Sequence, residues 1–118
     1  MPHIILDITP GLLPPERTHD LLARLVTRLG AFPTVDIATV KARIHRYEAG
    51  EFAVGAGHPA GFAHLTVQIL EGRPGDLRGK IADALWSELR DAFHEPSAAG
   101  EVNVTLELRE MARETYRK

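Results

Sequence analysis

The chain contains no cysteine, which excludes disulfide bonds, thiolate metal sites and cysteine nucleophiles together. It also lacks an excess of positive charge, because 14 basic side chains face 16 acidic ones. A nucleic-acid backbone is therefore not an expected partner. No apolar run approaches the ~18 residues that a membrane span needs. Stability must come from packing, and we expect neither nucleic acid nor a membrane as a partner.

Residue 1 is followed by no basic region, apolar stretch or small-residue cleavage site of the kind that marks a signal peptide. We therefore expect a cytoplasmic location. The 118 residues fit a single domain over residues 1–118, large enough for a two-layer core. Because a domain of this size gains from burying more surface, we expect several copies to assemble.

Hydrophobic periodicity predicts four strands and two helices. The expected strands cover residues 3–8, 40–47, 62–69 and 102–109. The first helix follows Pro14 and Pro15 and ends with Gly30 as its C-cap, and the second is capped by Asp76 and runs to Phe93. The expected irregular segments are a glycine-rich loop over residues 50–61, a loop over residues 94–100 and a charged tail over residues 110–118 that could extend onto a neighbouring subunit.

The order is β-α-β, a long loop and then β-α-β, which predicts an α+β fold with one four-stranded sheet. Two amphipathic helices can cover only one face of that sheet. The other face is polar, and we expect it either to meet water or to turn toward symmetry mates. Its predicted members are Lys41, Arg43, His45, His64, Thr66, Gln68, Asn103, Thr105 and Glu107.

Pro2 is the strongest candidate for chemistry because it directly precedes the first strand. If Met1 is removed, Pro2 carries a free secondary amine. An unperturbed α-amino group titrates near pH ~8, and desolvation or nearby cations lower that pKa. A group that titrates near neutrality suits a general base. Proline at position two is also common in proteins without such a role, and both interpretations are open from this residue alone.

Several short motifs together resemble the 5-carboxymethyl-2-hydroxymuconate isomerase family of the tautomerase superfamily. The resemblance runs from residue 1 to about residue 93. The motifs are Met1-Pro2-His3, Phe32-Pro33, Lys41-Ala42-Arg43-Ile44-His45, Phe62-Ala63-His64-Leu65-Thr66-Val67 and Gly72-Arg73.

The resemblance implies a homotrimer, with the polar sheet faces inside and active sites near the subunit boundaries. It also implies that Pro2 is the base that moves a proton between oxygen and carbon of an enol or dienol acid, without a cofactor. Such a reaction needs cations to hold carboxylates and the charge that builds on oxygen. Lys41 and Arg43 are the candidates for that role, and we expect a small dicarboxylate-type substrate.

Two further residues are candidates for substrate contacts. Phe62, at the start of the third strand, is a candidate pocket wall. Arg73 precedes the second helix in a segment that lacks the lysine and spacing of a phosphate-binding loop, so it is either a surface residue or a secondary substrate contact.

A metal site is not expected, because His3, His45 and His64 do not form a metal-ligand spacing with a supporting carboxylate. Ser87 and Ser97 lack the strand-to-helix elbow of a serine nucleophile. Two alternatives to an isomerase stay open. One is a hydratase or dehalogenase of the same superfamily, in which a protonated Pro2 acts as an acid. The other is a non-catalytic module that binds a small ligand.

Overall fold

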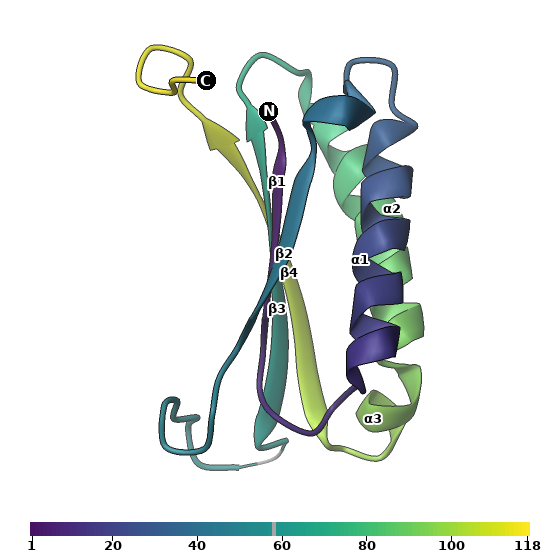
Figure 1. Ribbon diagram of the computed structural model, residues 1–118, viewed down its shortest axis with the longest axis vertical. Coiled ribbons are helices and arrows are strands. Elements are labelled where there is room, and N and C mark those ends of the chain that lie inside the picture. The colour runs from purple at the N-terminus through teal and green to yellow at the C-terminus, as the bar shows by residue number, and fades with distance from the viewer. Residues whose placement is uncertain (58) are drawn as a thin grey trace.

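Two long helices lie on the same face of one four-stranded sheet (Figure 1). The computed structural model describes residues 1–57 and 59–118. The elements are β1 (His3–Ile8), α1 (Pro15–Gly30), the 3₁₀ helix η1 (Ile37–Thr39), β2 (Lys41–Arg46), β3 (Gly61–Leu70), α2 (Gly75–Ala92), α3 (His94–Ala98) and β4 (Val102–Met111). The predicted β-α-β plus β-α-β architecture is confirmed.

The strand order in the sheet is β2-β1-β3-β4. In each half of the chain, the two strands joined through a long helix are parallel neighbours, β1 with β2 and β3 with β4. The halves meet through antiparallel pairing of β1 with β3, in which His3 lies opposite Gln68. The start of β1 therefore lies at the same end of the sheet as the ends of β3 and β4.

The hydrophobic core lies between the sheet and the helices. Alternate residues of β1 and β3 point into it, and Ile4 and Leu6 are fully buried opposite Val67 and Leu65. Each helix adds one apolar stripe with a spacing of four residues, which keeps its members on one face. Those stripes are Leu21, Leu25 and Leu29 in α1 and Ile81, Leu85 and Leu89 in α2.

Both predicted helix caps differ from the structure. Gly30 is the last residue of α1 and has no positive φ, and the C-cap is Ala31 in the right-handed region. A Cβ on Gly30 would lie 2.5 Å from Cγ1 of Ile37, so the glycine is required for close packing. Asp76 is not the N-cap of α2 either, since Pro74 holds that position and Asp76 lies in the first turn. There its negative charge still interacts favourably with the positive end of the helix dipole.

The loop predicted over residues 94–100 is wrong in part, because α3 occupies most of it. The amide of Ser97 donates to the carbonyl of Phe93 at 2.9 Å, and the buried Phe93 anchors this turn. Pro96 is tolerated because it lies in the first turn, where a backbone N–H has no partner inside the helix. In the glycine-rich segment, residues 50–57, 59 and 60 contain no helix or strand, and residue 58 lies outside the described residues.

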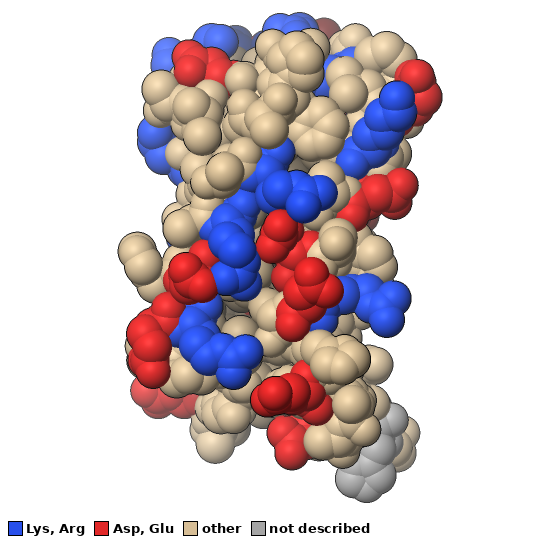
Figure 2. Space-filling view, turned by 90° about the vertical axis from the view of Figure 1, so that its right-hand side faces the viewer, with Lys and Arg blue, Asp and Glu red and all other residues tan. Residues whose placement is uncertain are grey.

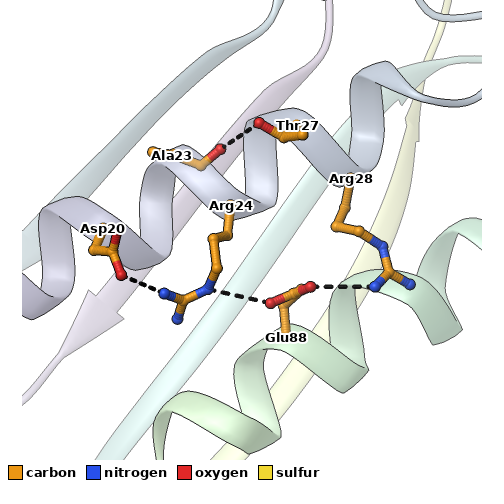
Figure 3. A network of polar contacts seen from close by, with 6 residues as sticks. All are labelled: Asp20, Ala23, Arg24, Thr27, Arg28 and Glu88. Atoms are coloured by element: carbon orange, nitrogen blue, oxygen red, sulfur yellow. Dashed lines mark hydrogen bonds and ion pairs between the residues drawn. The ribbon is translucent and has the colours of Figure 1, made fainter.

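Charged side chains of both signs cover the helical side of the molecule (Figure 2). Glu88 of α2 joins two arginines of α1, with Oε2 at 3.3 Å from Nε of Arg24 and Oε1 at 3.1 Å from Nη1 of Arg28 (Figure 3). Arg24 also pairs with Asp20. These contacts tie the helices together, although exposed ion pairs of this kind contribute only ~0–1 kcal/mol each. The helical side therefore presents no patch of one charge.

The opposite face of the sheet is polar, as expected, because its residues alternate with those of the core. Along the length of β1, the register places one residue of each strand in every row across this face. One row is Lys41, His3, Gln68 and Arg109, and a second is His45, Asp7, His64 and Thr105. This open face carries no helix in the described chain (Figure 1).

Candidate active site

Pro2 lies immediately before β1 and is buried. Its carbonyl accepts a hydrogen bond of 3.0 Å from the amide of Lys41, which fixes the chain start against the first residue of β2. Strand alternation places Pro2 on the side of Ile4, toward the helices, and His3 on the open face. The nitrogen of Pro2 is an amide while Met1 is attached, and it becomes a secondary amine when Met1 is absent.

A cavity of about 520 Å³ opens beside Pro2. Its volume lies in the range of ~300–1,000 Å³ that is typical of small-molecule sites. Four parts of the chain meet here, namely the N-terminus, the segment around η1, the end of β3 and the C-terminal segment. The lining residues are Met1, Pro2, Thr34, Val35, Asp36, Thr39, Leu70, Arg73, Arg113 and Lys118.

The cavity is cationic, since three basic side chains line it and Asp36 is the single acidic side chain among the described lining residues. Burial lowers the pKa of the N-terminal ammonium, and the charges of Lys118, Arg73 and Arg113 lower it further. Each cation disfavours a second positive charge nearby. The Met1 amine is therefore shifted toward its neutral form, and the same cations favour an anionic ligand in the cavity that Pro2 also lines.

Arg73 is a fixed part of the cavity wall. Its Nε donates to Oγ1 of Thr34 at 2.9 Å, and its Nη2 donates to the Thr34 carbonyl at 2.8 Å. Its Nη1 donates to the carbonyl of Leu70 at 3.1 Å. These bonds join the loop after α1 to the end of β3. Arg73 thus lines the same cavity as Pro2, and every guanidinium nitrogen donates to the protein.

The C-terminal segment, residues 112–118, belongs to the charged tail that could extend onto a neighbouring subunit, and within one chain it turns back to the N-terminus (Figure 1). The amide of Arg113 donates to Oε2 of Glu71 at 3.0 Å, and its Nε donates to the Glu71 carbonyl at 3.0 Å. The Tyr116 hydroxyl lies 2.9 Å from Nε2 of His3. Arg113 and Lys118 line the cavity, and neither is among the candidates that the sequence indicates. Tyr116, a lone aromatic residue among charged ones, was the available signal.

Lys41 and Arg43 lie beside the cavity but do not line it within the described chain. Both project from β2 on the open face, where Nη1 of Arg43 is 3.2 Å from Nδ1 of His3. Burial lowers the pKa of His3, and the charges of Arg43, the N-terminal ammonium and Lys41 lower it further. His3 thus connects the two cations of β2 with the C-terminal segment through Tyr116.

Phe62 lies at the far end of the sheet. It is opposite Asn103 near the start of β4, six residues along β3 from Gln68, which pairs with His3. Six residues of strand span about 20 Å. Phe62 instead packs against Tyr47 and Phe52, with ring centroids 5.9 and 6.0 Å away. One chain therefore does not bring Phe62 to Pro2.

Among residues 1–57 and 59–118, no group of three or more histidine, aspartate or glutamate side chains is arranged to hold a metal ion. His45 and His64 occupy one row of the open face with Asp7 between them, and Nδ1 of His45 is 3.6 Å from Oδ1 of Asp7. In the same part of the chain, no helix is long and apolar enough to cross a membrane.

Solved structures of other proteins share this fold. A 5-carboxymethyl-2-hydroxymuconate isomerase from Deinococcus radiodurans R1 has 30% identity and a TM-score of 0.86, covering 99% of this chain and 87% of its own. A fused 4-OT symmetric trimer has 21% identity and a TM-score of 0.71, covering 94% and 86%. N1, a member of the cis-3-chloroacrylic acid dehalogenase family, has 17% identity and a TM-score of 0.74, covering 98% and 79%. The fold is that of the tautomerase superfamily.

The model of the 5-carboxymethyl-2-hydroxymuconate isomerase family matches residues 2–118. The chain therefore belongs to this isomerase family, and the match includes the C-terminal segment that the sequence resemblance left out. No curated protein matches the sequence significantly.

Proposed function

We propose that this protein catalyses a proton shift in a small unsaturated 2-hydroxy or 2-oxo dicarboxylate such as 5-carboxymethyl-2-hydroxymuconate. The position of Pro2 carries the proposal. It is buried and lines the cationic cavity, and its nitrogen becomes a secondary amine when Met1 is absent. The membership of an isomerase family supports the same reaction class.

In the proposed mechanism, the neutral Pro2 amine takes the proton of the substrate's 2-hydroxyl group. The electron pair of the O–H bond forms the C=O bond, the conjugated double bonds shift, and a distal carbon takes a proton from the Pro2 ammonium. One proton is removed and one is returned, so the reaction balances without a cofactor. Cations of the cavity stabilise the negative charge that develops on oxygen.

Three copies of the chain complete the site in this proposal. The open sheet faces meet in a homotrimer, which places Lys41 and Arg43 at subunit boundaries as substrate contacts. Phe62, about 20 Å from Pro2 along its own sheet, serves as a wall of a neighbouring subunit's cavity. The fold shared with a solved symmetric trimer supports this arrangement. A solution mass three times the 13.0 kDa of one chain is the expected result.

The test is the ketonisation of 2-hydroxymuconate and of its carboxymethyl relative, followed by ultraviolet absorbance. The native protein, with Met1 loss checked by mass spectrometry, is compared with Pro2→Ala and with a form whose N-terminus is blocked by a tag. We expect activity only with the free proline. If the processed native protein is inactive on both compounds, or if the blocked form is equally active, the proposal is wrong. Retention of Met1 in the purified protein would favour a non-catalytic binding module.

A hydratase or dehalogenase is the second candidate, because Asp36 places a carboxylate in the cavity. Its Oδ1 accepts from the amide of Ala38 at 3.1 Å at the start of η1. A carboxylate near a protonated Pro2 could activate water for attack on an unsaturated acid. Chloride release from 3-chloroacrylate that is lost in Asp36→Asn would select this alternative.

A further inference from the structure

The two arginines of the cavity differ in how many of their guanidinium N–H donors have no partner among the described residues. An arginine has five N–H donors, and its two terminal nitrogens form a fork that matches a carboxylate. In Arg73, three of the five donors already bind the protein, because Nε and Nη2 donate to Thr34 at 2.9 and 2.8 Å and Nη1 donates to Leu70 at 3.1 Å, so each terminal nitrogen keeps one N–H. In Arg113, Nε donates to Glu71, and neither Nη1 nor Nη2 has a hydrogen-bond partner among residues 1–57 and 59–118.

Arg113 is nevertheless held in place. The carboxylate and the carbonyl of Glu71 accept from its amide and its Nε, both at 3.0 Å. Its guanidinium lies over Gly72, where an added Cβ would be 3.6 Å from Nη2 and 3.7 Å from Nε. A group that is fixed before binding loses little conformational entropy when a ligand arrives. The open terminal nitrogens of Arg113 are therefore preorganised.

The rest of the C-terminal segment reinforces this position. Tyr116 is hydrogen-bonded to His3 of β1, and Lys118 lines the same cavity as Arg113. A second cation at this wall adds attraction for an anion without needing a fixed geometry. The segment from residue 113 to residue 118 thus supplies one cationic wall of the cavity, and Pro2, which lines the same cavity, comes from the other end of the sequence.

We infer that Arg113 binds a carboxylate of the substrate through its two terminal nitrogens, and that Arg73 frames the cavity. This inference rests on the proposed function and deepens it, because it assigns recognition of the dicarboxylate to the C-terminal segment. Neither the family match nor the solved relatives assign this role to a residue of the chain. Lys118 supports the same carboxylate as a mobile charge.

The experiment compares two six-carbon dienes that differ by one carboxylate, muconate and sorbate, by calorimetric titration at one salt concentration. The native protein is expected to bind muconate more tightly. In Arg113→Gln, that preference should fall by about tenfold or more, because a charge-assisted bidentate contact is lost. Arg113→Lys should restore part of it. Arg117→Gln is the matched control, since Arg117 donates to backbone carbonyls of its own segment and should leave the preference unchanged.

Two results would overturn the inference. One is a muconate preference that is absent in the native protein or unchanged in Arg113→Gln, with circular dichroism showing that the variant is folded. The other is a preference that survives Arg113→Gln but collapses in Arg73→Gln. Binding is measured without turnover, so the two proposals can fail separately. If the protein prefers muconate through Arg113 but does not ketonise hydroxymuconates, the proposed function is wrong and the inference about Arg113 stands. With an active enzyme, Arg113→Gln should raise KM more than it lowers kcat.

Discussion

The Tyr116 hydroxyl lies 2.9 Å from Nε2 of His3, a contact between residues 113 positions apart. The other ring nitrogen of His3 is 3.2 Å from Nη1 of Arg43, which can only donate. Nδ1 must therefore accept, and in the neutral ring Nε2–H donates to the Tyr116 oxygen. The tyrosine proton is then available for the Met1 carbonyl at 3.5 Å. One tautomer of His3 satisfies the whole chain of contacts.

Replacing Tyr116 with Phe should therefore loosen the C-terminal segment. We expect the free energy of unfolding to fall by about 0.5–1.5 kcal/mol, the usual contribution of one hydrogen bond, and muconate binding to weaken severalfold. Urea unfolding and calorimetry measure the two effects. Tyr47→Phe is the matched control, because it removes only the hydroxyl that donates to Oδ1 of Asp7 at 3.0 Å, neither residue lines the cavity of its own chain, and the ring that packs against Phe62 is kept. An equal loss of muconate binding in Tyr47→Phe would contradict a specific role for Tyr116.

Acid should destabilise the protein through His3. Burial and the neighbouring positive charges lower the pKa of His3 in the folded state. As the pH falls below about 6.5, the unfolded chain binds the proton first, so stability is lost there and levels off below the folded-state pKa. The urea midpoint of the native protein should fall between pH 7.5 and pH 5 by more than that of His3→Gln. Parallel profiles for the two proteins would show that His3 contributes nothing.

The rate should rise with pH, because the proposed base works in its neutral form. Burial and the cations Lys118, Arg73 and Arg113 lower the pKa of the Met1 ammonium, and the same three cations line the cavity with Pro2, where they disfavour a positive charge on its amine. We expect kcat/KM to reach its plateau through an apparent pKa below the ordinary α-amino value of about 8. In Arg113→Gln the same transition should move to higher pH, since one of the cations is gone. If the apparent pKa is the same in Arg113→Gln as in the native protein, the charge of Arg113 does not influence the pKa of the base.

Two helical glycines should respond in opposite ways to alanine. Gly30→Ala would place a methyl group 2.5 Å from Cγ1 of Ile37, and such overpacking costs about 1–3 kcal/mol. Gly79→Ala lies within α2 and meets nothing within 4 Å, so it should stabilise by about 0.5–1 kcal/mol. Thermal and urea unfolding of both variants check the pair. A stabilised Gly30→Ala would show that Ile37 moves aside freely.

The arrangement of strands and helices could be predicted from the sequence because it follows hydrophobic periodicity. The alternation from Ala63 to Ile69 and the four-residue spacing of Leu21, Leu25 and Leu29 each indicate which face is buried. The residues expected to cap the helices were less informative about where each helix ends. Gly30 has no positive φ, so its backbone conformation does not require glycine. The close approach of the Ile37 side chain does, and the local sequence around residue 30 does not reveal that contact.

The candidate site was predicted only where a residue carries its own chemical signal. Pro2 has one because of its place at the chain start, and Arg73 because it precedes a helix. Arg113 and Lys118 lie in a polar segment without periodicity, and their position depends on the pairing of Glu71 with Arg113 and of His3 with Tyr116. Contacts between residues so far apart in the chain leave no local pattern.

The closure of the C-terminal segment onto β1 also has a consequence for the order of events during synthesis. A nascent chain that has emerged through β3 contains the residues of β1, β2 and β3 and Pro2. Arg113 and Lys118 follow β4 in the chain, so the wall that they form is made only after all four strands. A stalled or shortened product could therefore form much of the sheet and still be unable to hold a dicarboxylate.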